Sequence, residues 1–242
     1  MKNIISNYSK EAIIIGGGTS IESYISLLQP LCASKFTILT NYSYKHFIGT
    51  FLTFMDRDFY KTRDEKEHPD IYEELKKLPL IVGINQNGVD EFKLDNTILL
   101  PRKQFYSGTQ INLTGIFSLS LAIELLNHVG TIYLLGFDWS CRNIDMSSEN
   151  YRTHSTEDLH YYKKEINHIG CGFFGGYERH SPDKIFEPFL KEKDVKIFNV
   201  SPESNINTFE KINYEKMFSL LNSEIINQEE LRNQIRSKLC IM

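Results

Sequence analysis

One stretch of the chain, residues 113–139, restricts the fold more than any other. Apolar residues recur at helical spacing over 116–126, and a glycine-containing break ends that pattern. Residues 131–135 then form an unbroken apolar run, which is typical of a parallel strand buried on both faces. Gly136 and Asp138 follow that strand, where an open α/β sheet binds its ligands. The alternative is that Gly136 only makes a turn and Asp138 only caps the next segment.

A second strand, turn and helix lie near the start of the chain. The β-branched run at residues 12–15 precedes a helical pattern that begins at about residue 21. Between them lie Gly16, Gly17, Gly18, Thr19 and Ser20. Glycines let the backbone approach a phosphate or ribose, and a hydroxyl can cap a helix whose N-terminus attracts anions. The turn matches neither the GxGxxG fingerprint nor a Walker loop, but it predicts the first βα unit of a Rossmann-like sheet.

Further apolar runs predict the remaining elements. Strands are expected at residues 35–40, 51–55, 80–84, 97–100 (an edge strand) and 195–200. Helices are expected at residues 71–78, 185–191, 206–221 and 227–238. We therefore expect an α/β fold, a Rossmann-like, mostly parallel sheet flanked by helices, in one domain over residues 1–242. Its nucleotide-binding core would comprise residues 10–140 and 180–222, with a C-terminal helix at 224–240.

Polar residues follow two of the predicted strands, Asn41 after 35–40 and Asp56 after 51–55. The carboxyl ends of parallel strands share one edge of a sheet, so both are candidates for a binding site there. The alternative is that both simply begin loops, as Asn and Asp often do. The strand that ends at Gly136, Phe137 and Asp138 is followed by a polar segment at 141–179. An insertion of this length at that edge is typical of a lid.

Composition excludes several classes of protein. The net charge of −4 argues against a general nucleic-acid binder. The four cysteines form no CxxC pair, and the histidines lack zinc-site spacing, so free thiols in a reducing cytoplasm are expected. No apolar run approaches the roughly 20 residues of a membrane span. We expect a soluble cytoplasmic protein, and peripheral membrane attachment and homo-oligomerisation stay open.

The order of these features resembles one Rossmann-like superfamily. It includes bacterial CMP-sialic acid-dependent sialyltransferases, Maf flagellin glycosyltransferases and MptE-like (6-hydroxymethylpterin pyrophosphokinase-like) proteins. IIIGGGTSIES is similar to its G-x-G-P-S-L opening, without the Pro, and ILTNYSY to a strand ending in Asn beside the nucleotide. LTG at 113–115 and GFDW at 136–139 take the places of a Thr-Ser-Gly turn and a Gly-Ile-Asp-Phe-Tyr strand end. HSPDKIFEPFLKEKDVKIFNVSPESNINTFEKI, residues 180–212, is similar to a His-Ser followed by a helix, a strand and a Pro-containing turn.

The resemblance implies a sialyltransferase-like glycosyltransferase that moves a sugar, a nonulosonic acid, from a CMP-activated donor to a glycan hydroxyl, with no cofactor or metal required. His180 would be the general base, since a neutral imidazole has a suitable pKa; the alternative is a surface histidine at a helix start. Tyr151, or else Tyr161 or Tyr162, would assist the departing phosphate, and Asp138 is the third expected catalytic residue. The residues expected to line the nucleotide and leaving group are Gly16, Gly17, Gly18, Thr19, Asn41, Asp56, Thr114, Gly115, Trp139 and Ser140.

Two departures keep other functions open. Trp139 and Ser140 stand where the sialyltransferases have a tyrosine, and an indole cannot usefully lose a proton. Asp56 stands where the MptE-like branch tends to have Asp. The first alternative is therefore a Mg²⁺-dependent diphosphate-transferring enzyme, with Asp56 and Asp138 holding the ion near phosphates. The second is a nucleotide-binding protein that does not turn its ligand over.

Overall fold

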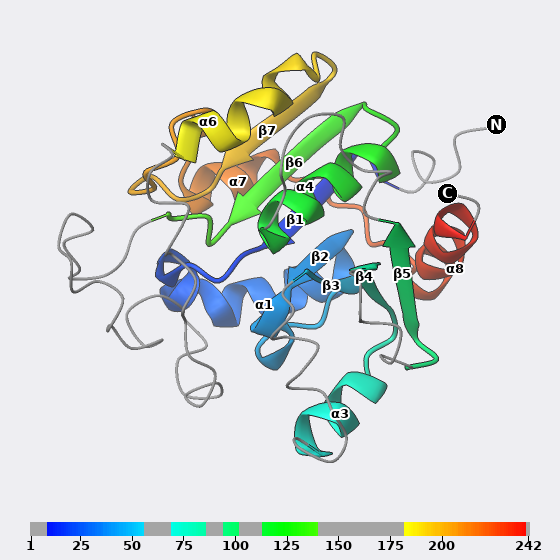
Figure 1. Ribbon diagram of the computed structural model, residues 1–242. Helices are drawn as coiled ribbons and strands as arrows, with labels where there is room; N and C mark the ends of the chain where they lie inside the picture. Colours follow the sequence, from blue (N-terminus) through cyan, green and yellow to red (C-terminus); the bar gives the residue numbers. More distant parts are fainter. Residues whose placement is uncertain (1–8, 56–68, 86–93, 102–112, 140–181, 241–242) are drawn as a thin grey trace, which may run out of the picture.

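The computed structural model describes residues 9–55, 69–85, 94–101, 113–139 and 182–240 (Figure 1). Within these ranges, eight strands form one sheet in the order β5-β4-β3-β2-β1-β6-β7-β8, and every pair is parallel. The strands are β1 (Glu11–Ile15), β2 (Thr37–Thr40), β3 (Phe51–Phe54), β4 (Ile81–Asn85), β5 (Thr97–Pro101), β6 (Gly130–Leu135), β7 (Val195–Asn199) and β8 (Glu210–Lys211). The predicted α/β fold with a Rossmann-like parallel sheet is confirmed, and β5 is the predicted edge strand.

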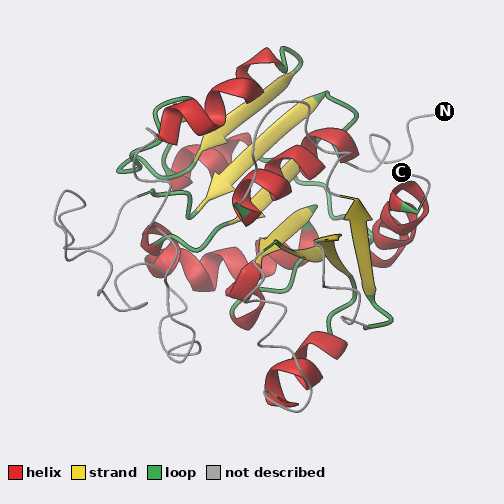
Figure 2. Cartoon of the chain, viewed as in Figure 1, coloured by secondary structure: helices red, strands yellow, loops and turns green. Residues whose placement is uncertain are grey.

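Helices cover both faces of this sheet (Figure 2). They are η2 (Thr19–Tyr24), α1 (Ile25–Ser34), η3 (Asn41–Lys45), α3 (Pro69–Lys76), α4 (Thr114–Leu125), α6 (Pro182–Phe186), η7 (Glu187–Lys191), α7 (Tyr214–Leu220) and α8 (Gln228–Leu239). Side chains of a strand alternate between the faces. Thus Ile14 of β1 packs in the layer that contains α4, α6 and α8, whereas Ile13 and Ile15 pack with α1, α3 and α7.

Helix α4 makes the connection that determines where a site can form. Each strand from β2 to β5 lies next to the preceding strand, on the same side of β1. Helix α4 then leads to β6, which lies on the other side of β1. Ten of its 12 residues are buried, which explains why it is apolar on nearly every side. The order of the strands reverses between β1 and β6, and the carboxyl ends of the strands at such a point are where open α/β sheets bind ligands.

One predicted helix is wrong. Residues 206–221 contain a loop, the two-residue strand β8 and the short helix α7 instead of one helix. Ile206, Phe209 and Ile212 are all buried, and their spacing of three residues imitates a helix. The chain pairs with β7 at Glu210, and α7 begins only after Asn213, whose side chain accepts the Lys216 N–H at 2.9 Å.

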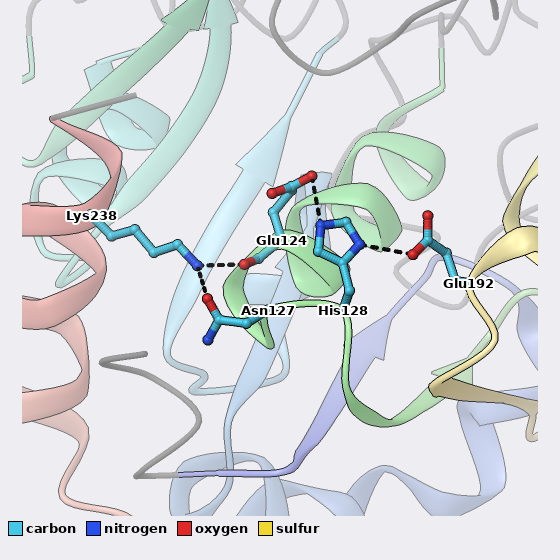
Figure 3. A network of polar contacts seen from close by, with 5 residues as sticks. All are labelled: Glu124, Asn127, His128, Glu192 and Lys238. Atoms are coloured by element: carbon cyan, nitrogen blue, oxygen red, sulfur yellow. Dashed lines mark hydrogen bonds and ion pairs between the residues drawn. The ribbon is translucent and has the colours of Figure 1, made fainter. Parts of the chain in front are cut away.

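The predicted C-terminal helix is present as α8, which lies beside β5 (Figure 1). Its Arg232 Nε donates to the carbonyl oxygen of Thr50 at 2.9 Å. Its Lys238 Nζ donates to the main chain of Glu124 and, at 3.0 Å, to the side-chain oxygen of Asn127 (Figure 3). The helix is therefore fixed at the edge opposite to the carboxyl ends of the strands.

None of the helices in the described ranges has the length and apolar character that crossing a membrane requires. The expected single domain stays a prediction. So does the expected lid at 141–179, because that whole segment lies outside the described residues.

Candidate functional site

The candidate site begins where the chain leaves β1 and β6. The Gly16 N–H donates to the carbonyl oxygen of Leu135 at 2.7 Å, and the Gly18 N–H to that of Gly136 at 2.8 Å. A β-carbon on Gly16 would lie 2.5 Å from the Gly136 oxygen, and one on Gly18 would lie 2.5 Å from the carboxylate of Asp138. Two glycines of the turn are thus required by its close approach to the end of β6. The third, Gly17, is half-buried at the tip of the turn.

Asp138 holds the same turn in place. Its Oδ2 accepts the Ser20 N–H at 2.8 Å, and its Oδ1 accepts the Ser20 hydroxyl. Ser20 Oγ also lies 2.8 Å from Ser201 Oγ, which follows β7. Asp138 is buried in the segment that follows β6, and its bond to the Ser20 N–H caps the first turn of η2 although the two residues are 118 positions apart. The predicted catalytic role of Asp138 stays a prediction; the structure adds a positioning role.

These contacts change what the glycine turn can offer a ligand. The N–H groups of Gly18 and Ser20 are already bonded to Gly136 and Asp138. The turn therefore provides close backbone approach at its tip rather than a full set of free amide donors. Behind it, the ring of Tyr214 stacks on Tyr24 with 3.8 Å between centroids, and burial together with the charge of Asp138 raises the pKa of the Tyr214 phenol.

The second part of the site lies at the ends of β2 and β3. The Thr114 hydroxyl donates to Asn41 Oδ1 at 3.0 Å and accepts the Met55 N–H at 3.2 Å. Asn41 has a φ of 47°, a left-handed conformation that asparagine tolerates better than most residues. Gly115 is needed here because a β-carbon would lie 2.9 Å from the ring of Phe137. The starts of η3 and α4 thus meet through Asn41 and Thr114, and Gly115 of α4 lies against the segment that follows β6.

The structure places nine of the predicted site residues at one edge of the sheet. They are Gly16, Gly17, Gly18, Thr19, Asn41, Thr114 and Gly115, and Asp138 and Trp139 on the segment that follows β6. Trp139 is half-buried, and its indole meets Phe186 of α6 edge-on at 6.2 Å. Asp56, Ser140, Tyr151 and His180 lie outside the described residues.

Sequence reasoning predicted a turn after the strand at 195–200, but it missed the contacts that this loop makes with the site; residues 200–209 are here called the β7–β8 loop. Its Ser204 hydroxyl donates to the carbonyl oxygen of Phe137 at 2.7 Å. Its Asn205 donates from the main chain to the Asp138 carbonyl at 2.8 Å and from the side chain to the Trp139 carbonyl at 2.9 Å. The signal available in the sequence was the density of Ser, Asn and Thr after a strand, which favours side-chain bonds to main chain.

The same loop binds the start of α6 through Asp183. Asp183 Oδ1 accepts the Asn207 N–H at 2.6 Å and the Thr208 hydroxyl at 2.8 Å. Burial alone would raise the pKa of Asp183, but the hydrogen bonds from Thr208 and Asn207 outweigh it and lower the pKa. The carboxylate is therefore charged at neutral pH, the form in which it accepts these bonds best.

The fold and this edge define a class: a parallel α/β protein with a candidate ligand site at the reversal of its strand order. No protein-family model matches the chain, and neither does any curated protein. Among solved structures, it is similar to a Maf glycosyltransferase from Magnetospirillum magneticum AMB-1, with a TM-score of 0.54 and 13% sequence identity. That similarity covers 97% of this chain and 38% of the other protein, so the chain spans well under half of that protein's length. At this identity the similarity establishes the fold.

Proposed function

We propose that the protein is a glycosyltransferase that uses a CMP-activated sugar, a nonulosonic acid, and a glycan hydroxyl as acceptor. The main observation in support is that the glycine turn and the hydrogen-bonded Asn41–Thr114 pair lie at the same carboxyl edge beside the strand reversal, with Phe137 close to both Gly16 and Gly115. The solved structure with a similar fold is itself a Maf glycosyltransferase. The sequence resemblance to the CMP-dependent enzymes supports the choice of nucleotide.

In this proposal the glycine turn and the Asn41–Thr114 pair hold the nucleotide. The acceptor oxygen bonds to the anomeric carbon of the sugar while the bond from that carbon to the phosphate oxygen breaks. CMP leaves with the bonding electrons, and His180 takes the acceptor proton. The Ser20–Asp138 pair keeps the glycine turn against the end of β6.

A Mg²⁺-dependent diphosphate transfer is the second candidate, and one observation favours it. A carboxylate, Asp138, and a hydroxyl, Ser20, adjoin the glycine turn, and Mg²⁺ near phosphates prefers such oxygen ligands. Ser20 already engages both carboxylate oxygens, however, so an ion there would have to displace existing hydrogen bonds. For this reason we place the metal-independent transfer first.

A ligand panel separates these candidates. The melting temperature is measured with CMP, CDP, ATP, GTP and UDP, each with and without Mg²⁺. A ligand at a hundred times its Kd stabilises the folded protein by about 2.7 kcal/mol. Stabilisation by CMP or CDP without metal supports the proposal, whereas stabilisation only by ATP or GTP with Mg²⁺ would replace it with the diphosphate transfer.

A turnover assay with CMP-activated sugars then tests the base. His180→Ala is expected to abolish transfer while CMP binding is retained. The matched control is His128→Gln, at the amino-terminal edge, which should transfer at the wild-type rate. CMP binding without turnover in the wild type would indicate a nucleotide-binding protein instead of an enzyme.

A further inference from the structure

A row of buried hydroxyl groups leads from the interior of the sheet to the Asn41–Thr114 pair. Ser118 lies one turn after Thr114 in α4, and its hydroxyl donates to the Thr114 carbonyl oxygen at 2.7 Å. The hydroxyl of Thr53, in β3, donates to the carbonyl oxygen of Leu39, in β2, at 2.9 Å. The two hydroxyl oxygens lie 2.7 Å apart, and either can donate to the other. The Thr53–Ser118 pair therefore joins α4 to both β2 and β3.

This pair lies in a layer that is otherwise apolar. Thr53 and Ser118 are fully buried, and Phe51, Phe117 and Leu119 are core residues of the same layer. Each hydroxyl has one proton, so the pair makes the bond between its members and one of the two carbonyl bonds at a time. A rotation or shift of α4 would break the bond between the hydroxyls and leave polar atoms unpaired among apolar side chains, which is costly. The pair thus favours one position of α4 on the sheet.

The position of α4 determines how Thr114 meets Asn41. Thr114 is the first residue of α4, and its hydroxyl donates to Asn41 Oδ1 at 3.0 Å and accepts the Met55 N–H at 3.2 Å. The single hydroxyl proton is therefore directed at the side-chain oxygen of Asn41. An amide group has an acceptor on one side and a donor on the other, so this bond fixes which way the Asn41 amide faces.

We infer that Ser118 and Thr53 are positioning residues for nucleotide binding: they hold α4 where Thr114 fixes the orientation of the Asn41 side chain. This inference rests on the proposed function, in which Asn41 helps to hold CMP. The same helix provides a matched control in Ser120. Its side chain is also buried, but its hydroxyl has no hydrogen-bond partner among the described residues.

CMP is titrated calorimetrically into the wild type and the variants, well below their melting temperatures. Ser118→Ala removes the hydroxyl next to Thr114, and Thr53→Val keeps the shape of the side chain without its hydroxyl. Each should raise the Kd for CMP at least about fivefold, as expected for the loss of one hydrogen bond. Thr53→Ser retains the hydroxyl and should bind CMP within about twofold of the wild type. Ser120→Ala breaks no bond between described residues and should match the wild type.

A second control separates positioning from a general loss of stability. Ile123 is a buried residue of α4, and Ile123→Val lowers stability through packing alone. This variant should keep the wild-type Kd for CMP. A rise in Kd for Ile123→Val or Ser120→Ala equal to that for Ser118→Ala would show that any weakening of α4 has the same effect, and would overturn the inference.

Amide hydrogen exchange gives a readout that needs no ligand. Ser118→Ala and Thr53→Val should speed exchange at the Met55 amide, which donates to Thr114, and leave the Ser20 amide as in the wild type.

The titrations also separate this inference from the proposed function. If the wild type binds CMP and Asn41→Gly binds it more weakly, wild-type affinity in Ser118→Ala would overturn the inference alone. A loss in Thr53→Ser equal to that in Thr53→Val would do the same. If the wild type does not bind CMP, the proposed nucleotide and this inference fall together.

Discussion

Replacing Asp138 with alanine separates a structural role of this carboxylate from a catalytic one. The change removes the acceptor of two hydrogen bonds from Ser20 and leaves the Ser20 N–H without its partner. A hydrogen bond to a charged group contributes about 1.5–3 kcal/mol, and half-buried Ser20 can regain part of that from water. We therefore expect a loss of about 3 kcal/mol in the free energy of unfolding. For a chain of this size that lowers the melting temperature by about 6–12 °C.

The assay is urea unfolding of Asp138→Ala, Ser20→Ala and the double variant. Ser20→Ala removes only the hydroxyl bonds, to Asp138 and Ser201, and should cost about 1–2 kcal/mol. Because the two residues share a bond, the double variant should be more stable than the sum of the single losses predicts, by about 1 kcal/mol or more. Asp95→Ala, at an exposed position, is the control. Wild-type stability in Asp138→Ala, or strictly additive losses, would refute the positioning role.

Two further predictions concern groups away from the glycine turn. The hydrogen bond with Glu192 raises the pKa of His128 (Figure 3). The interaction therefore contributes its full stability below the unfolded pKa of 6.5, and this contribution is lost as the pH rises through the folded pKa. Urea midpoints should show His128→Gln less stable than wild type at pH 5.5 by a few tenths of a kcal/mol, and equal at pH 9; the opposite trend would contradict this. Asn199 is fully buried, and its amide atoms have no partner among the described residues. Asn199→Leu should therefore raise stability by about 1 kcal/mol in the same assay, and a loss would indicate a partner such as a buried water.

The fold was largely predictable because its signal is local. Buried parallel strands such as 131–135 are short, continuous apolar runs, and the glycine turn and the helical patterns separate them. The exception, 206–221, failed because buried Ile206, Phe209 and Ile212 share the spacing of a helix face although they belong to a loop and a strand. Spacing alone does not distinguish these cases when the segment between the apolar residues is held by tertiary contacts.

The site was predictable only in outline. Asn41 could be placed at the carboxyl edge because it follows a predicted strand, and Thr114 because it begins a predicted helix. The carboxyl ends of parallel strands and the starts of the helices that follow them share one edge of the sheet. Their hydrogen bond joins residues 73 positions apart, and it depends on the path of α4 across the sheet. The same holds for Ser20 with Asp138 and for Asp183 with the β7–β8 loop, since hydrogen bonds between loops leave no periodic pattern in the sequence.

The most direct test of the central claim is a calorimetric titration of CMP into the wild type, Asn41→Gly and Asn127→Gly. Asn41 and Asn127 both have a left-handed backbone, with φ of 47° and 54°, which glycine adopts without strain. Only Asn41 lies at the proposed nucleotide edge, whereas Asn127 lies at the opposite edge, where it contacts Lys238. We predict equal, metal-independent CMP affinity for the wild type and Asn127→Gly, and a Kd at least about tenfold higher for Asn41→Gly. No binding by the wild type, or equal affinity in all three, would contradict the account.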